Sequence, residues 1–319
     1  MSRLLNLSHK MITTTATARL QMFSNHVNAS ASSSHTLPSG SKFTLDYKVY
    51  YRDPVTGKPG SWFHDVPLGL DKVGRTVSMV VEIPRWSNAK MEITTKLPLN
   101  PITQDTKKGK LRFIHNIYPH HGYIHNYGAI PQTWEDTTEV HPDVGGLKGD
   151  NDPVDICDLG KSVGKLGDIV KIKVLGSLAL IDDGELDWKV IGINVADPMV
   201  SKLNDIQDVE KYMPGVLSST RNWFRDYKIP AGKGANEFAF DGEYRNVQET
   251  IKVIEETHES WKKLMQHKVS GKGLPKVINT KVSGTPGFKN SVKQEELGIK
   301  PEEDDGAVPR EVSEIYYLS

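Results

Sequence analysis

Five short segments rich in β-branched residues constrain the fold of this chain more than any other feature. Gly, Pro and Asp separate them, and several alternate apolar with polar positions, which is typical of short strands joined by tight turns. The segments are TVSMVVEIP (76–84), KMEIT (90–94), LRFIHN (111–116), DIVKIKVLG (168–176) and DWKVIGINV (187–195). Many short strands of this kind predict a mainly β fold with a closed or partly closed barrel.

Helical patterns come later in the chain. In KLNDIQDVEKYMPG, Asn204 is a candidate N-cap with Gln207 reaching back to it, and Pro214 ends the helix. A second helix is expected over VLSSTRNWFRDY (216–227). The third is the clearest, because its apolar residues recur about every 3.6 positions and form one stripe that should pack against the barrel. These residues are Val247, Ile251, Ile254, Trp261 and Leu264.

The two ends of the chain differ in composition from its middle. Residues 1–42 are rich in Ser and Thr and carry Arg3, Lys10 and Arg19, while the first acidic residue is Asp46. This composition is typical of an organellar transit peptide, so we expect a disordered leader, with an ordinary disordered tail as the alternative. A folded domain is expected over 43–268. Frequent Gly and Pro without a period predict an extended or poorly ordered tail over 269–319.

Charge and cysteine content exclude several classes of protein. The 40 basic residues balance the 40 acidic ones, so no overall field attracts nucleic acid or an anionic membrane. Cys157 is the single cysteine and therefore has no intramolecular disulfide partner. Lys171 and Lys173 interrupt the most hydrophobic stretch, which leaves no run of the ~18 apolar residues that a membrane-spanning helix needs. We expect no transmembrane segment.

One short segment concentrates carboxylates. GDNDPVDICDLG (149–160) places Asp150, Asp152, Asp155 and Asp158 within nine residues. In an extended chain Asp150 and Asp152 point to the same side, and Pro153 fixes a bend that lets Asp155 turn back toward them. Converging carboxylates are what a Mg²⁺ site requires. Taken alone, however, such a motif is more often a solvated acidic turn than a set of ligands.

Other segments contribute charged and polar residues that could join these aspartates in one site. DDGELDWK (182–189) adds acids at the edge of two predicted strands, and in KMEI the alternation puts Lys90 and Glu92 on one face. Carboxylates alone would repel one another, so a site this negative implies bound cations. Arginine, lysine and tyrosine are the donors that a polyanionic phosphate needs. The candidates are Arg112, Tyr123, Tyr127, Tyr227 and Lys228.

Together these segments resemble the soluble family I inorganic pyrophosphatases. GDNDPVD is similar to the D-x-D-P-x-D signature of that family. Five further segments resemble the flanking segments of its eukaryotic members. They are VVEIPRWSNAKMEI, GKLRFIHNIYPHHGYIHNYGAIPQTWED, DDGELDWKVI, LNDIQDVEKYMPG and RDYKIP. The similarity runs in order over about residues 43 to 267. With its leader included, the chain most resembles the fungal mitochondrial forms.

This resemblance implies a fold, an activity and a location. The fold is a five-stranded OB-like closed barrel with flanking helices. The activity is hydrolysis of inorganic pyrophosphate to two phosphates, with several Mg²⁺ ions per active site. Residues 43–268 then form the catalytic domain, and residues 1–42 are a mitochondrial transit peptide. The protein is expected to be a homodimer in the mitochondrial matrix, with a cytoplasmic location as the alternative.

The resemblance also implies which residues hold metal. Asp150, Asp155 and Asp187 ligate the metal that binds more tightly, and Asp155 also reaches the second one. Glu92, Asp182 and Asp187 serve the metals that arrive with the substrate. Five acidic residues from three segments would therefore share the metals.

The remaining roles concern water and phosphate. By resemblance, Asp152 holds and deprotonates the attacking water between the first two metals, with Tyr123 beside the reacting groups and Glu82 in support. Residues expected to bind phosphate oxygens or complete their pocket are Arg112, Lys90, Tyr127, Tyr227, Lys228 and Lys189. Asp158 lies outside the family's ligand set and is expected to be a surface or supporting residue.

Two alternatives remain open from the sequence. The substrate could be another phosphoanhydride, such as a nucleotide or a polyphosphate. A barrel with scattered aromatic residues could also bind nucleic acid. Such a surface should be basic, whereas the acids of this cleft would repel phosphates unless cations intervene. We therefore expect pyrophosphate as the ligand and no nucleic acid.

Overall fold

Residues 35–318 are described by a computed structural model, and they are mainly β with few helices. The predicted leader lies outside the described residues except for positions 35–42. The helices are α2 (Ile206–Tyr212), α3 (Val216–Asp226) and α4 (Val247–Met265). Short 3-10 turns lie at Pro142–Val144, Ile229–Ala231, Phe240–Gly242, Gln294–Leu297 and Arg310–Ser313. Among the described residues, no helix has the length and apolar content needed to cross a bilayer.

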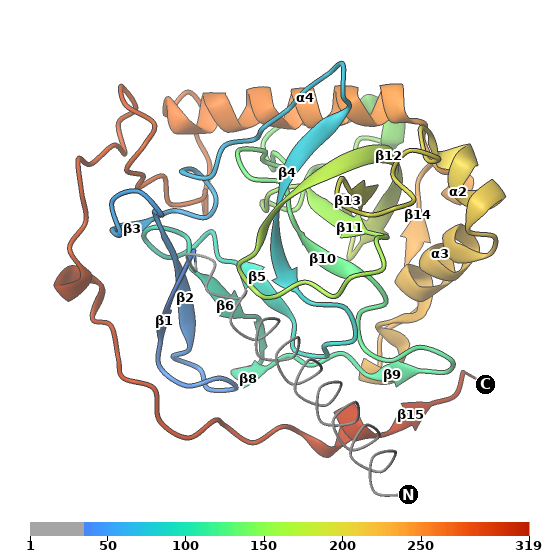
Figure 1. Cartoon of the computed structure of the whole chain (residues 1–319), viewed down its shortest axis with the longest axis horizontal. Helices are drawn as coiled ribbons and strands as arrows, with labels where there is room; N and C mark the ends of the chain where they lie inside the picture. The colour runs from blue at the N-terminus through green and yellow to red at the C-terminus, as the bar shows by residue number, and fades with distance from the viewer. Residues whose placement is uncertain (1–34, 319) are drawn as a thin grey trace, which may run out of the picture. The chain divides into compact units, whose positions relative to one another are not determined.

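The strands form two larger sheets and two small ones (Figure 1). The first sheet contains β4 (Thr76–Ile83), β10 (Asn126–Ala129), β11 (Asp155–Asp158), β12 (Ile169–Asp182), β13 (Glu185–Asn194) and β14 (Glu237–Phe238). The second contains β1 (Thr36–Ser39), β2 (Lys48–Arg52), β3 (Pro59–Gly60), β5 (Met91–Ile93) and β6 (Ile102–Gln104). The small sheets pair β7 (Thr106–Lys107) with β8 (Lys110–Leu111), and β15 (Ile315–Tyr316) with β9 (Asn116–Ile117).

Strands β12 and β13 of the first sheet pair with each other although they stand far apart in its strand order. The order is β13-β11-β10-β4-β12, and β12 also pairs with β13. Strand β12 reaches both neighbours because its first part pairs with β4 and its longer remainder with β13, with a register shift between Val174 and Gly176. A Cβ atom at Gly176 would lie 2.5 Å from the Arg245 carbonyl oxygen. Only glycine therefore lets the chain pass so closely at this irregularity.

Alternate residues of these strands point to opposite faces, and both faces are buried. One face joins a core that includes Tyr127, Ala129, Cys157, Leu178, Leu180 and Ile191. The other joins a core that includes Val77, Met79, Val81, Ile156, Ala179 and Val190. Helix α3 contributes Trp223 and Phe224 to the first core, and α4 contributes Val247 and Ile254 to the second. Of the predicted α4 stripe, Val247, Ile251 and Ile254 pack on this second core, whereas Trp261 and Leu264 join the first.

Three of the five predicted strands match β4, β12 and β13. Segment 90–94 corresponds to β5 but belongs to the second sheet. The strand predicted over 111–116 is wrong, because β8 ends at Leu111 and β9 begins at Asn116. Strands β10 and β11 were not predicted. Their sequences, NYGA and DICD, contain Asn, Gly and Asp, which disfavour strands by themselves.

The helices follow the predicted pattern with one correction. The N-cap of α2 is Asp205, not Asn204, and its reciprocal capping partner is Asp208 rather than Gln207. Either register satisfies the first helical N–H groups, so the local sequence did not decide between them. Helix α3 occupies the predicted segment, and α4 begins with a capping box formed by Asn246 and Glu249.

The ends of the domain are more closely attached than composition indicated. Strand β1 lies within the range assigned to the leader, and it pairs with β2. After α4 the tail runs round the edge of the domain as an extended chain (Figure 1). It is fastened at intervals: the Thr280 amide donates to Asp65, the Lys300 amide donates to Ser39 Oγ, and β15 pairs with β9.

Candidate active site

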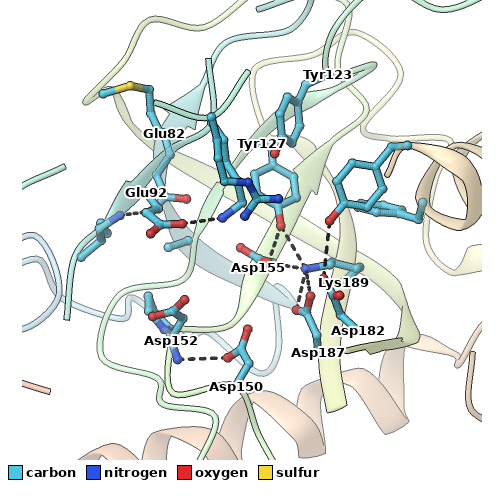
Figure 2. Close-up of a pocket in the computed structure, with 18 of the residues that line it drawn as sticks. Glu82, Glu92, Tyr123, Tyr127, Asp150, Asp152, Asp155, Asp182, Asp187 and Lys189 are labelled. Carbon is cyan, nitrogen blue, oxygen red and sulfur yellow. Dashed lines mark hydrogen bonds and ion pairs between the residues drawn. The ribbon is translucent and has the colours of Figure 1, made fainter. Parts of the chain in front are cut away.

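A charged pocket opens on the face of the first sheet that α3 flanks (Figure 2). Its lining includes seven carboxylates, from Glu82, Glu92, Asp150, Asp152, Asp155, Asp182 and Asp187. Three cationic side chains line it as well, from Lys90, Arg112 and Lys189. Every residue predicted for the site lies in this lining except Lys228, whose ammonium forms an ion pair with Asp182 at the edge of the pocket. The fold has thus gathered these residues from segments more than a hundred positions apart.

The β12–β13 hairpin places several of these groups on one face. Asp183 and Gly184 both have positive φ, of 49° and 89°, as a two-residue turn between strands requires. Asp187 is paired with Leu180, so Asp182, Asp187 and Lys189 share a face by the period of two. Strand β11 runs parallel to β13 on its other side and pairs Asp155 with Lys189.

Tyr127 enters the pocket at an irregularity in β10. The register between β10 and β4 shifts between Tyr127 and Gly128, and a Cβ atom at Gly128 would lie only 1.9 Å from the Val80 carbonyl oxygen. Glycine is therefore required for the two strands to approach each other here. The Tyr127 hydroxyl donates to Asp155 and accepts from Lys189 Nζ at 3.0 Å.

The loop before β11 holds Asp150 and Asp152. The Asp152 amide donates to Asp150 Oδ1 at 3.0 Å, and the Asp152 carbonyl accepts from the Glu135 amide at 2.9 Å. The next residues anchor the loop, because the fully buried Val154 donates its amide to Thr133 Oγ1 at 3.0 Å. This anchoring leaves both carboxylates directed into the pocket (Figure 2).

Three carboxylates converge below this loop. One oxygen each from Glu135, Asp150 and Asp187 lie within 4.8 Å of one another. Glu135 Oε1 accepts from the Trp188 amide at 2.9 Å, but its buried Oε2 has no hydrogen-bond partner. A buried carboxylate oxygen without a donor is costly. The cluster therefore fits a cation bound through oxygen ligands.

The cations of the pocket are paired with its acids. Lys189 contacts both Asp155 and Asp187, Lys90 contacts Glu92, and Lys228 contacts Asp182. Lys90 and Glu92 thus share a face, as predicted. Arg112 donates to Asp105 at 2.5 Å, and Asp105 also lies 3.5 Å from Lys90. These pairs offset part of the negative charge.

Burial shifts the pKa values of the pocket carboxylates upward. Removal from water, followed by repulsion from neighbouring acids, raises the pKa of Asp150 and of Asp152 well above the usual range. Burial likewise raises the pKa of Asp187 to about 7, even though Lys189 opposes the shift. Glu82 and Glu135 shift in the same direction for the same first reason, burial. Without added positive charge the pocket cannot keep all these groups ionised.

An aromatic wall closes one side. The rings of Trp223 and Tyr227 are stacked with centroids 5.0 Å apart, and Tyr123 packs against Trp223 at 5.1 Å. The Tyr227 hydroxyl lies 3.5 Å from Asp182 Oδ2. Burial raises the pKa of Tyr123, Tyr127 and Tyr227. These hydroxyls therefore keep their protons and remain hydrogen-bond donors.

Asp158 is the exception within its segment. It is buried rather than a surface residue, as one of the two predicted roles had it, and it does not line the pocket. Its Oδ1 accepts from the Gly160 amide at 2.8 Å and the Asn194 amide at 2.9 Å, and its Oδ2 accepts from Asn126 Nδ2 at 3.0 Å. These bonds give Asp158 a supporting role in the fold.

Two residues of the site were missed by reasoning from the sequence. Glu135 belongs to TWED, within a segment that resembles the family, and the acidic pair Glu135-Asp136 is the signal that could have marked it as a ligand. Asp105 stands alone among Thr, Gln and Lys, so no local pattern marks it. Only the fold brings it to Arg112 and Lys90.

Comparison with known proteins identifies the family. A family model described as inorganic pyrophosphatase matches residues 79–262, which is more than half of the chain. The chain belongs to the inorganic pyrophosphatase family. This pyrophosphatase is therefore a hydrolase that acts on the diphosphate bond, and the match spans every acidic residue of the pocket.

Individual relatives extend the similarity beyond that region. The pyrophosphatase is 51% identical over 280 residues to an inorganic pyrophosphatase of Candida glabrata, covering 88% of this chain and 96% of the relative. It is 52% identical over 289 residues to the mitochondrial inorganic pyrophosphatase of Saccharomyces cerevisiae, covering 89% of each. The solved inorganic pyrophosphatase of Schistosoma japonicum superposes with a TM-score of 0.82 at 44% identity, covering 89% of this chain and 100% of that one.

Proposed function

We propose that this inorganic pyrophosphatase hydrolyses pyrophosphate to two phosphates in the pocket of Figure 2, with magnesium as its metal. The observation that carries the proposal is the excess of carboxylates over cationic side chains in that pocket. Such a site would repel a polyanion by itself. Divalent cations remove the repulsion and bind both the carboxylates and the phosphates.

The ligand set consists of hard oxygen donors, which suit magnesium. Asp150, Asp155 and Asp187 would hold the metal that binds more tightly, with Asp155 shared, and Glu92, Asp182 and Asp187 would serve the metals that arrive with pyrophosphate. The converging oxygens of Asp150 and Asp187 and the unpartnered oxygen of Glu135 support this assignment. When bound, magnesium supplies the Lewis acidity that lowers the pKa of water and neutralises phosphate oxygens.

Asp152 is the proposed general base. Burial and the neighbouring Asp150 raise its pKa well above the usual value for aspartate. A carboxylate in that environment is a stronger base than one in water, and so better suited to accept the proton of an attacking water near neutral pH. The hydrogen bond from its own amide to Asp150 fixes the loop that presents it.

The donors of the pocket would bind the phosphate groups. Arg112 can grip two phosphate oxygens at once, and the lysines act as point charges. In the structure these cations contact pocket acids. The proposed phosphate ligands are Arg112, Lys90, Lys189, Lys228, Tyr127 and Tyr227, with Tyr123 beside the reacting groups. Glu82 supports them by accepting the Ile93 amide at 2.6 Å, which holds β5 in place.

Phosphate release tests this proposal directly. It should be measured from pyrophosphate and from ATP, each with Mg²⁺ and with a chelator. We expect rapid release only from pyrophosphate with Mg²⁺. Equal rates with ATP would show a broader phosphoanhydride hydrolase, and release in the chelator would exclude the metal-dependent mechanism.

We also propose that the strand circuit is an OB-like closed barrel. The circuit β13-β11-β10-β4-β12, with β12 also paired to β13, supports this proposal. The barrel, with α2, α3 and α4 outside it, and the sheet that carries β5 would form one catalytic domain. An experimental structure that breaks any pairing of the circuit would contradict it.

For the location and assembly we propose a mitochondrial homodimer. The Ser- and Thr-rich leader without acids and the similarity to a relative named mitochondrial support the location. Because β1 pairs with β2, a removed leader should end before Thr36. Sequencing the N-terminus of the native protein tests this, and a mature protein that begins at Met1 would contradict it. The homodimer follows from the resemblance to fungal members, and sedimentation in solution tests it.

A further inference from the structure

We infer that Asn116 and the C-terminal end of the tail position the loops that carry Lys90 and Tyr123 into the pocket. The inference rests on the proposed function, because it assigns those two side chains to pyrophosphate. The tail residues involved, 312–316, lie outside the region matched to the family. Asn116 itself lies in β9 and does not line the pocket.

Asn116 is buried, with 2% of its surface exposed, and its amide group makes four hydrogen bonds. Its Nδ2 donates to the carbonyl oxygens of Val312 at 2.8 Å and Glu314 at 3.0 Å. Its Oδ1 accepts from the Gly122 amide at 2.9 Å and from Asn88 Nδ2 at 2.8 Å. One side chain therefore joins the tail to two different loops.

The first of these loops leads directly to Tyr123. Gly122 has a φ of 52°, and a Cβ atom there would lie 2.4 Å from the Ser87 carbonyl oxygen. The Tyr123 amide donates to that same carbonyl at 3.0 Å, and the Trp86 amide donates to the Tyr123 carbonyl at 2.7 Å. The Gly122 amide that Asn116 fixes is thus adjacent to the backbone that aims Tyr123.

The second loop leads to Lys90. Asn88 Nδ2 also donates to the Ile114 carbonyl at 2.9 Å, and the Ile114 amide donates back to the Asn88 carbonyl at 2.8 Å. Two residues later the Lys90 amide donates to the Arg112 carbonyl at 3.1 Å. Holding Asn88 therefore also holds the backbone from which Lys90 and Arg112 reach the phosphate site.

The tail supplies what fixes the Asn116 amide. Strand β15 lies parallel to β9, pairing Ile315 with Asn116, and the Tyr118 amide donates to the Tyr316 carbonyl at 3.0 Å. Figure 1 shows the tail reaching β9 only after passing round the domain. Without these tail carbonyls the Asn116 Nδ2 would lose both acceptors, and the orientation of its Oδ1 toward the two loops would no longer be fixed.

The arrangement predicts a selective effect. Asn116 acts on the side of the pocket that binds phosphate, whereas Asp150 and Asp187 are held by β11, β13 and the loop before β11. Displacing the phosphate side should raise KM for pyrophosphate and leave the affinity for Mg²⁺ alone unchanged. A small displacement of positioning groups is enough to change a rate by an order of magnitude or more.

The main test compares two asparagine variants in the full-length chain. Asn116→Asp keeps an acceptor for the loops but turns a carboxylate oxygen toward two carbonyls of the tail. Asn279→Asp is the matched control, because Asn279 is also fully buried and its Nδ2 donates to Val277 O and Thr285 Oγ1 within the tail. We expect Asn116→Asp to raise KM for pyrophosphate roughly 10-fold, and Asn279→Asp to leave KM unchanged.

A second variant removes less buried surface than a change at Asn116 itself. Ile315→Gly with Tyr316→Gly weakens β15 while removing only side chains that are 53% and 40% exposed. It should raise KM in the same direction, and amide hydrogen exchange at Gly122 and Tyr123 should accelerate in it and in Asn116→Asp. Unchanged KM and exchange in both variants, or an equal rise of KM in Asn279→Asp, would overturn the inference. The wild-type rate on pyrophosphate with Mg²⁺, measured alongside, shows separately whether the proposed function stands.

Discussion

The pocket differs in its hydrogen bonding from three buried polar residues outside it, His64, Asp65 and Asp158, which are called the polar frame below. Asp150 and Asp158 come from one short segment, and both are removed from most contact with water. Asp158 accepts three hydrogen bonds from the protein. Asp150 accepts one from the Asp152 amide and faces the carboxylates of Glu135 and Asp187. Burial alone therefore does not mark a functional carboxylate; Asp150 differs from Asp158 because it faces other carboxylates rather than donors.

The same contrast holds for other members of the frame. The buried His64 ring accepts from Trp261 Nε1 at 2.9 Å, and its Nε2 lies 3.0 Å from the Lys276 carbonyl oxygen. Asp65 accepts from the amides of Ser61, Thr280 and Lys281. The frame satisfies its polar groups internally and so stabilises the fold. The pocket leaves charge for ligands to satisfy, which costs stability in their absence.

The largest effect should come from the proposed base in the pocket. Asp152→Asn removes the proton acceptor but keeps the size and the amide that donates to Asp150. We expect kcat to fall by roughly 10² to 10⁴, the usual contribution of general-base catalysis. Steady-state phosphate release with Mg²⁺ measures it. Turnover close to that of the wild type would remove Asp152 from this role.

The next largest effect should come from Arg112, a cationic side chain proposed to bind phosphate. Arg112→Ala should lower kcat/KM by roughly 10² to 10³, because a charged donor to the phosphate is lost. Arg225→Ala is the matched control, since Arg225 pairs with Asp226 and its side chain is 49% exposed outside the pocket. A change in the unfolding midpoint of Arg112→Ala without a change in kcat/KM would make Arg112 structural.

Substitutions of Asp150 and Asp158 should have different effects on the free energy of unfolding. Asp158→Asn places an NH₂ group among donors, so the free energy of unfolding should fall by about 3 kcal/mol. Asp150→Asn removes like-charge repulsion and keeps the acceptor for the Asp152 amide, so with a chelator present it should be neutral or stabilising by up to ~1 kcal/mol. Urea unfolding of both variants measures this. Equal losses would show that the pocket is as internally satisfied as the frame.

A comparable effect on stability should come from pH, through the buried His64 of the frame. Burial lowers the pKa of His64 from 6.5 to about 4, so the unfolded chain binds more protons than the folded one between these values. Stability should therefore fall as the pH falls from about 6.5 to about 4, with this group contributing about 3 kcal/mol. Urea unfolding at several pH values over that range gives the free energy of unfolding as a function of pH. This free energy should change less with pH for His64→Gln than for the wild type. The same pH dependence in both proteins would exclude His64 as its source.

Much of the site could be predicted because its signals are local. The alternation in KMEI and the apolar positions of α4 each depend on residues a few positions apart, and the structure has both features. The acids of the motif also had to lie near cations, since their mutual repulsion follows from composition alone. These features are set by backbone geometry and charge, which the sequence determines by itself.

The tertiary structure decided what depends on distant partners. Whether Asp158 is a surface or a supporting residue was decided by Asn126 and Asn194, and the place of Asp105 by Arg112. Strands β10 and β11 form despite poor local propensity because their neighbours supply the hydrogen bonds. The lone pairs of a side chain are satisfied by whichever groups folding brings to it, and that choice is made over the whole chain rather than within a motif.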